Sequence, residues 1–103
     1  MIFSNFVKSE VDNLVTFKNS IPIQNVGSIK FYKDNSSGSF SKKEFRWSFN
    51  KDYWSSWETL NQGKFTNINT KGNPCIYIEI RYILANTSSK VTSFSLDYID
   101  NTT

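Results

Sequence analysis

The chain has 103 residues, with 12 Lys and Arg against 9 Asp and Glu, a net charge of +3, one cysteine and no histidine. This length fits one domain with its own core, and a single cysteine excludes an internal disulfide. Without histidine, Ser-His-Asp and Cys-His catalysis and an ordinary zinc site are excluded as well.

The amino-acid composition favours β-structure. One Ala and four Leu stand against ten Ile and nine Phe, and β-branched and aromatic residues are enriched in strands. Asn, Ser and Thr are abundant, and their side chains compete with helices through local hydrogen bonds. The sequence therefore predicts an all-β fold.

The N-terminal residues are unusually apolar. Ile2, Phe3, Phe6 and Val7 are too apolar for a free tail, yet the segment is too short to fold alone. We expect residues 1–10 to form an N-terminal arm or edge strand and residues 11–103 to form the sandwich domain. An edge strand can add to a partner sheet through its backbone, so these four residues are a candidate assembly arm. Their deletion should then weaken association more than folding.

Alternation predicts the next strand over residues 11–17, where Val11, Val15 and Phe17 would share one face. Residues 20–25 contain a proline and are predicted to be a connection.

A further strand is predicted over residues 28–33, with Ile29 and Phe31 facing the same way. Residues 34–41 consist mainly of Asp, Asn, Ser and Gly, and they predict a loop.

The second half of the chain contains the clearest alternation. Strands are predicted at residues 44–49, 54–60, 64–69, 76–84 and 92–99, with turns at 50–52, 61–63, 71–74 and 86–90. We expect the core to be formed by Phe45, Trp47, Ile78, Ile80, Phe94 and Leu96. Seven or eight short strands with turns between them indicate a single antiparallel β-sandwich, either a jelly roll or an immunoglobulin-like one.

Two of these strands carry the pattern Glu-x-Arg on their polar face. If they pair antiparallel, Glu44 lies opposite Arg81 and Arg46 lies opposite Glu79. The alternative is that these four side chains face a partner chain and form an interface.

Tyr53, Trp54 and Trp57 lie close together in the sequence. Exposed coplanar aromatic rings can stack on sugars, which makes these three residues a candidate glycan platform. In the other interpretation, Trp54 and Trp57 cover the open end of the sandwich.

Other chemistry has weaker support. Glycosidases need two carboxylates flanking a bond, but Glu44, Glu58 and Glu79 are each expected on a polar strand surface. Calcium binds to clustered oxygen ligands, whereas Asp34, Asn35, Asp52 and Asp97 are dispersed. The four glycines are scattered singly and form no phosphate-binding loop. We therefore expect no catalysis, no metal and no cofactor.

The polarity of the chain bears on its partners. The one adjacent basic pair, Lys42-Lys43, precedes Glu44, so no basic stripe indicates nucleic-acid binding. No segment approaches the roughly 20 apolar residues of a membrane span, and no signal peptide is recognised. Cys75 is expected to be a buried or half-buried strand residue. We expect synthesis in the cytoplasm and neither a membrane nor a nucleic-acid partner.

Three segments follow one another in a recognisable order: Arg46-Trp47-Ser48-Phe49, then Trp54-Ser55-Ser56-Trp57, then Tyr77-Ile78-Glu79-Ile80-Arg81-Tyr82. This order resembles a β-sandwich module of tail, baseplate and fibre-associated proteins of tailed bacteriophages. The resemblance covers about residues 27–99, although such modules usually lie within longer chains.

The resemblance implies a structural protein of a virion tail or baseplate, made in the host cytoplasm and docked to other virion proteins in a symmetric, multi-copy assembly. The alternative function is a carbohydrate-binding module that recognises a cell-surface glycan through Trp54 and Trp57.

Overall fold

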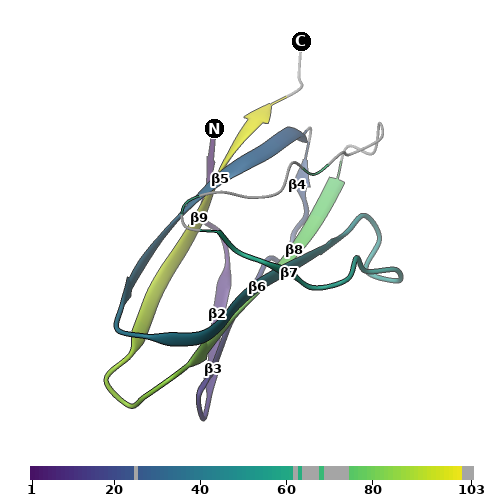
Figure 1. Ribbon diagram of the computed structural model, residues 1–103. Coiled ribbons are helices and arrows are strands. Elements are labelled where there is room, and N and C mark those ends of the chain that lie inside the picture. The colour runs from purple at the N-terminus through teal and green to yellow at the C-terminus, as the bar shows by residue number, and fades with distance from the viewer. Residues whose placement is uncertain (25, 62, 64–67, 69–74, 101–103) are drawn as a thin grey trace.

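Two antiparallel sheets pack against each other in the computed structural model (Figure 1). The structure describes residues 1–24, 26–61, 63, 68 and 75–100. Within these ranges there are nine strands and no helix. The predicted all-β sandwich is confirmed, although the described residues contain more strands than the seven or eight expected.

The smaller sheet has the order β1-β9-β5, and its strands are β1 (Ile2–Phe3), β9 (Lys90–Asp100) and β5 (Val26–Ser37). The larger sheet has the order β2-β3-β8-β6-β7, and its strands are β2 (Val7–Val11), β3 (Leu14–Lys18), β8 (Cys75–Leu84), β6 (Phe40–Ser48) and β7 (Glu58–Thr59). A further short strand, β4 (Ile23–Gln24), also pairs with β8.

The core lies between the two sheets, and β8 contributes most to it. Its inward residues are all fully buried: Ile76, Ile78, Ile80 and Tyr82. Five of the six residues predicted for the core are buried: Phe45, Ile78, Ile80, Phe94 and Leu96. Trp47 lies one residue from the end of β6 and is half-buried, with its ring 5.8 Å from that of Phe45.

A tight turn divides the strand that was predicted over residues 11–17. Asp12 has φ 55°, and Asp12-Asn13 connects β2 to β3 as a two-residue hairpin loop. Asp and Asn tolerate the left-handed conformation that such loops require. Val15 and Phe17 are buried as expected, but Val11 lies before the turn and is exposed.

The prediction for β5 was wrong in two respects. The register with β9 shifts between Ile29 and Phe31, which indicates a β-bulge. A bulge inserts one residue and changes the facing of those beyond it, so Ile29 is buried while Phe31 is 51% exposed. The predicted loop at 34–41 is largely strand, because β9 provides backbone partners as far as Ser37.

The remaining differences concern short segments. Only Glu58–Thr59 of the predicted strand 54–60 forms a strand. The predicted connection 20–25 includes the two-residue strand β4, in which Ile23 is buried. The strand predicted at 64–69 lies almost entirely outside the described residues.

A buried asparagine joins β3 and β4 along the same edge of β8. The pairing of β3 with β8 ends at Lys18 and resumes in β4 at Ile23. Between these points the Asn19 side chain donates to the carbonyl of Ile76 at 3.2 Å and accepts from the N–H of Ile78 at 2.8 Å. The side-chain amide thus substitutes for a strand backbone where the chain leaves the sheet.

Candidate functional site

The outer face of the larger sheet carries the predicted charge pairs. Arg46 donates to Glu79 Oε2 from Nε at 3.0 Å and from Nη2 at 2.8 Å. Arg81 Nε lies 2.9 Å from Glu44 Oε1, and its Nη2 lies 2.8 Å from the same oxygen. The strand register places each Glu opposite its Arg. The predicted antiparallel pairing is confirmed, and we call these four residues the charge square.

Two tryptophans lie over the charge square. The guanidinium carbon of Arg46 is 4.5 Å from the ring centre of Trp54 and 4.8 Å from that of Trp57. The guanidinium carbon of Arg81 is 3.8 Å from the ring centre of Trp57. Such contacts contribute from about 0.5 kcal/mol when exposed to about 2 kcal/mol when desolvated. Trp54 and Trp57 therefore lie on the outer sheet face, because the arginines offer cationic surfaces there, and not at the open end of the sandwich.

The segment that carries these tryptophans is anchored to β6 and β8. Trp47 N donates to Ser55 Oγ at 3.0 Å, and Ser55 N donates to the Trp47 carbonyl at 2.9 Å. Trp54 Nε1 donates to the Lys51 carbonyl at 2.9 Å, and Lys51 Nζ lies 4.7 Å from the centre of the Tyr77 ring. These contacts hold the segment against β6 and β8 and orient the Trp54 indole.

The turn after β6 is closed by side-chain hydrogen bonds. Ser48 Oγ accepts from Asn50 N and Lys51 N, and Asn50 Oδ1 accepts from Asp52 N and Tyr53 N. The turn projects the Tyr53 side chain into solvent, where it is 83% exposed.

The structure brings together six of the seven residues predicted for the binding surface, namely Glu44, Arg46, Trp54, Trp57, Glu79 and Arg81. Tyr53 stands apart from them. Nothing in the sequence indicated that the indoles would lie on the guanidinium groups, because the segment between β6 and β7 has no periodic pattern.

A hollow of about 380 Å³ lies beside the charge square. Its lining includes Trp54, Lys18, Ser20, Lys51 and Glu79. The sequence analysis missed this hollow, because four of these residues come from connections and a strand end far apart in the chain.

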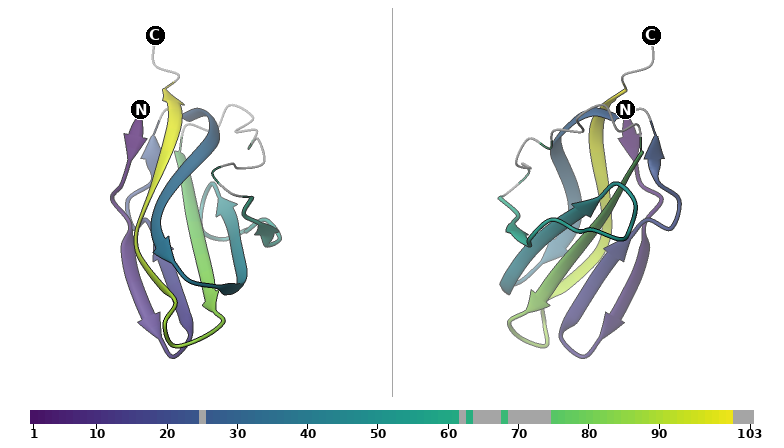
Figure 2. Two further views of the ribbon diagram at one scale, coloured as in Figure 1. Left: turned by 60° about the vertical axis from the view of Figure 1, so that its left-hand side comes forward. Right: turned by 90° about the vertical axis from the view of Figure 1, so that its right-hand side faces the viewer.

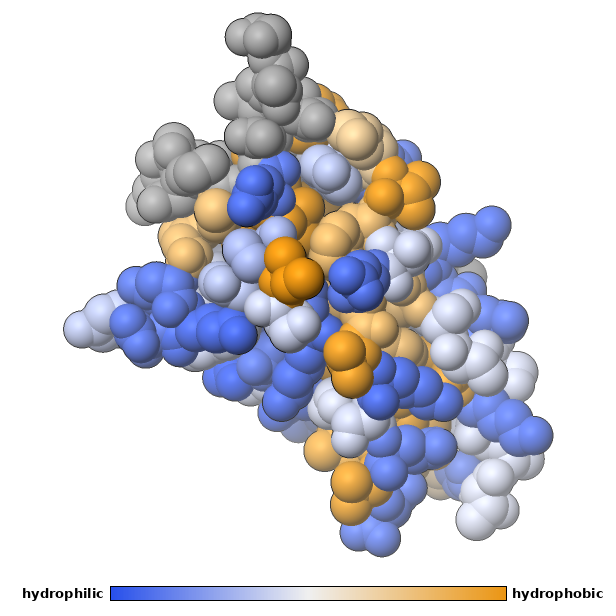
Figure 3. Space-filling model, turned by 180° about the vertical axis from the view of Figure 1, so that it is seen from behind, coloured by the Kyte–Doolittle hydropathy of each residue, from blue (hydrophilic) through white to orange (hydrophobic). Residues whose placement is uncertain are grey.

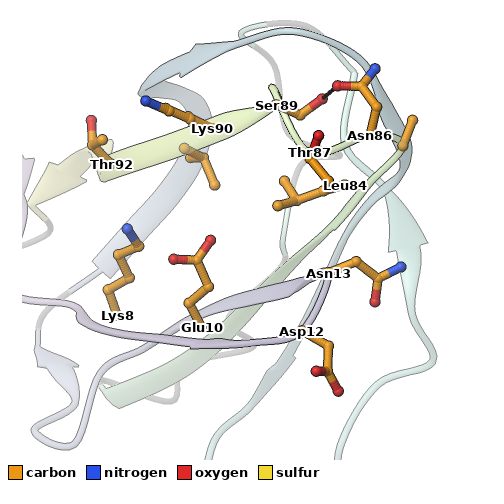
Figure 4. Close-up of a pocket in the computed structure, with 12 residues that line it drawn as sticks. Lys8, Glu10, Asp12, Asn13, Leu84, Asn86, Thr87, Ser89, Lys90 and Thr92 are labelled. Carbon is orange, nitrogen blue, oxygen red and sulfur yellow. Dashed lines mark hydrogen bonds between the residues drawn. The ribbon is translucent and has the colours of Figure 1, made fainter.

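A second hollow, of about 600 Å³, lies at the other end of the sandwich (Figure 4). It separates β2 from the first residues of β9, and Lys8, Glu10, Leu84 and Lys90 are among its lining residues. Lys8 and Glu10 point from β2 into the hollow (Figure 4). No motif in the sequence indicated this hollow.

The predicted assembly arm is divided between the inside and the outside of the protein. Phe3 and Phe6 are half-buried, with ring centres 5.2 Å apart, and the Phe6 ring centre is 5.5 Å from that of Phe94. Ile2 and Val7 are 68% and 61% exposed. Its residues therefore contribute to the fold, and its role in assembly stays a prediction.

A buried tyrosine contacts one of the candidate calcium ligands. The Tyr82 hydroxyl donates to Asp34 Oδ2, and Ser36 Oγ donates to Asp34 Oδ1 at 3.0 Å. Burial raises the pKa of Tyr82 well above its usual value, and the hydrogen bond to Asp34 raises this pKa further. Within the described ranges, no three acidic or cysteine side chains converge as ligands for a metal ion.

The three carboxylates considered as glycosidase residues lie on opposite faces of the larger sheet. Glu44 and Glu79 are bound to arginines on the outer face. Glu58 pairs in register with Phe45, so its side chain lies on the opposite face. The three carboxyl groups therefore do not flank one site.

Exposed apolar side chains are dispersed over the surface. Seen from behind, they appear as separate spots among hydrophilic residues (Figure 3). Ile2, Val7, Val11, Ile21 and Ile99 are each more than half exposed. In the part of the chain that the structure describes, no helix has the length and apolarity needed to cross a membrane.

Comparison with protein-family models, with curated proteins and with solved structures finds no match to this chain. Its class is therefore defined by its own fold, which is an all-β sandwich with an ordered Trp–Arg–Glu surface on the larger sheet.

Proposed function

We propose that the chain is a non-catalytic structural module of a tailed-phage virion that docks to tail or baseplate proteins. One observation carries this proposal. The residues behind the sequence resemblance form a single unit in which Arg46 and Arg81 bind both to carboxylates and to indole rings. The resemblance thus rests on side chains that act together, and not on three unrelated segments.

The chemistry of this unit favours assembly over catalysis. Both carboxylates of the charge square are bound to guanidinium groups. A general acid or base must reach its substrate within hydrogen-bonding distance, and here each carboxylate is held by an arginine. A rigid, charge-balanced sheet face instead provides a fixed surface for a protein neighbour.

The proposal places the protein in the virion, in several copies, in contact with other virion proteins. The test is to purify intact particles of the parent phage through a density gradient and to count the chain by quantitative mass spectrometry. We expect a fixed ratio, with several copies per particle. Its absence from infectious particles that contain the other tail proteins would contradict the proposal.

Glycan binding is the second candidate function, and the hollow beside Trp54 favours it. Trp57 already contacts two guanidinium groups, so Trp54 is the better aromatic surface for a sugar. A glycan array separates the two functions. Binding that is lost in Trp54→Ala and kept in Tyr53→Ala, with both variants folded, would support a glycan site. An array without signal for the wild-type protein would contradict it.

A further inference from the structure

Strand β2 lies at one edge of the larger sheet (Figure 2, right), and β7 lies at the other. Its five residues, Val7–Val11, are all exposed. Among the described residues it pairs with β3 alone, so its other side is a free edge.

The pairing of β3 shows which backbone groups face this free edge. The Asn13 carbonyl accepts from Leu84 N on β8. Backbone groups alternate in direction along a strand, so the odd residues of β3 turn towards β8 and the even residues towards β2. Thr16 therefore hydrogen-bonds to its register partner Ser9. Lys8 and Glu10 consequently turn their N–H and C=O groups towards the free edge.

We propose that β2 pairs with β2 of a second copy of this chain, antiparallel, about a two-fold axis at Ser9. The sequence Val7-Lys8-Ser9-Glu10-Val11 is self-complementary in this register. Lys8 of each copy lies opposite Glu10 of the other, and Val7 lies opposite Val11. A two-fold interface uses the same surface on both subunits, and this strand satisfies that requirement in charge and in shape.

The same register uses the backbone. Lys8 and Glu10 would form hydrogen-bonded pairs across the axis, and each such pair exchanges two N–H···O bonds. Val7 and Val11, 61% and 64% exposed, would meet on the outer face beside Leu14. Lys8 and Glu10 would meet on the other face, where the 600 Å³ hollow leaves room for the partner's side chains (Figure 4). The two larger sheets would become one continuous sheet.

The charges also select the register. Charged residues on an edge strand usually prevent pairing between molecules. Sliding β2 by two residues would place Lys8 opposite Lys8 in one direction and Glu10 opposite Glu10 in the other, which is unfavourable. A slip by one residue would turn the valines of one copy to the opposite face. The charges and the valines of β2 therefore disfavour other registers and favour the one centred on Ser9.

The contact is small, because five residues per copy bury less area than a standard interface. We expect a reversible dimer whose population rises with protein concentration. In a multi-copy particle the high local concentration of copies would favour the same contact. This inference does not depend on the virion role, since it concerns the isolated protein.

The test is sedimentation velocity of the full chain from micromolar to about millimolar concentration. We expect a concentration-dependent dimer. Lys8→Glu and Glu10→Lys should each raise the dimer dissociation constant about tenfold or more, because each places like charges opposite one another twice. Lys33→Glu, which makes the same charge change at an exposed position of β5 in the smaller sheet, should leave dimerisation unchanged.

Two complementation experiments make the test specific. The double variant Lys8→Glu/Glu10→Lys restores opposite charges and should dimerise like the wild type. An equimolar mixture of the two single variants should form a heterodimer, because one chain then carries two acidic and the other two basic edge residues. A wild-type protein that is monomeric at every concentration would overturn the proposal. A dimer that neither single variant weakens would overturn it as well.

Discussion

At the scale of single residues, Asn19 shows how one polar side chain can complete a sheet. It is 4% exposed, and it binds the N–H of Ile78, which has no strand residue opposite it on this side, and the carbonyl of Ile76, where the pairing with β4 begins. A buried backbone group without a partner costs about 1–3 kcal/mol. Asn19 therefore stabilises the point at which the chain leaves the sheet between β3 and β4.

Replacing this side chain should destabilise the protein. In Asn19→Ala the N–H of Ile78 loses its acceptor and the carbonyl of Ile76 loses a donor. We expect the free energy of unfolding to fall by about 2–4 kcal/mol, as measured by urea denaturation. Asn5→Ala is the matched control, because Asn5 is exposed and should change stability by less than about 0.5 kcal/mol. Equal effects of the two variants would contradict this role for Asn19.

The charge square could be predicted from the sequence, whereas Asn19 could not. Glu44, Arg46, Glu79 and Arg81 lie in strands with strict alternation, and two Glu-x-Arg patterns match in one antiparallel register alone. The role of Asn19 depends on where β3 ends and β4 begins along β8. No local pattern in the sequence records that geometry.

At the scale of elements, alternation predicted β8, β9 and the second half of β6 well, because each has one face in the core. The prediction was wrong for residues 34–37, where Asp, Asn and Ser continue β5. Those residues are polar, and the backbone ladder with β9 holds them in the strand. Turn residues therefore mark the limits of a strand poorly when its partner is long.

The connection between β5 and β6, which passes from one sheet to the other, depends on one glycine. Gly38 has φ 89°, and a Cβ there would lie 2.8 Å from Ser89 Cα. Ser89 in turn accepts from Ser39 N at 3.0 Å, and its hydroxyl lies 2.6 Å from the Ser39 carbonyl. The connections β5–β6 and β8–β9 therefore approach each other too closely at this end of the sandwich for any side chain at position 38.

A pair of alanine substitutions separates the two effects at Gly38. Gly63 also has a positive φ, 73°, but a Cβ there meets nothing within 4 Å. Gly63→Ala should cost only the backbone strain, about 1–2 kcal/mol. Gly38→Ala should cost about 1–3 kcal/mol more, because the new methyl group must displace Ser89. Chemical denaturation measures both values, and a Gly38→Ala variant no less stable than Gly63→Ala would contradict the steric argument.

At the scale of the whole molecule, the N-terminal residues join the two sheets. The strand β1 pairs with β9 in the smaller sheet, and β2 pairs with β3 in the larger one. The connection between them carries Phe6 against Phe94 of the core. The division of the chain after residue 10 therefore falls inside β2, and the first ten residues are placed as edge strands of both sheets.

This placement changes what removing the N-terminal residues should do. Because Phe6 packs against Phe3 and Phe94, Phe6→Ala should lower the free energy of unfolding by about 2 kcal/mol. This is less than the roughly 3–5 kcal/mol expected for a fully buried Phe, because Phe6 is half-buried. Ile2→Ala, at a site 68% exposed, should change it by less than about 0.5 kcal/mol. Denaturation by urea at a concentration where the protein is monomeric measures both without any contribution from association. If Phe6→Ala were as stable as Ile2→Ala under those conditions, the N-terminal residues would be an arm free to serve assembly alone. The expected difference would instead show that they are part of the folded sandwich, so that any role in assembly falls to their exposed side chains and to the free edge of β2.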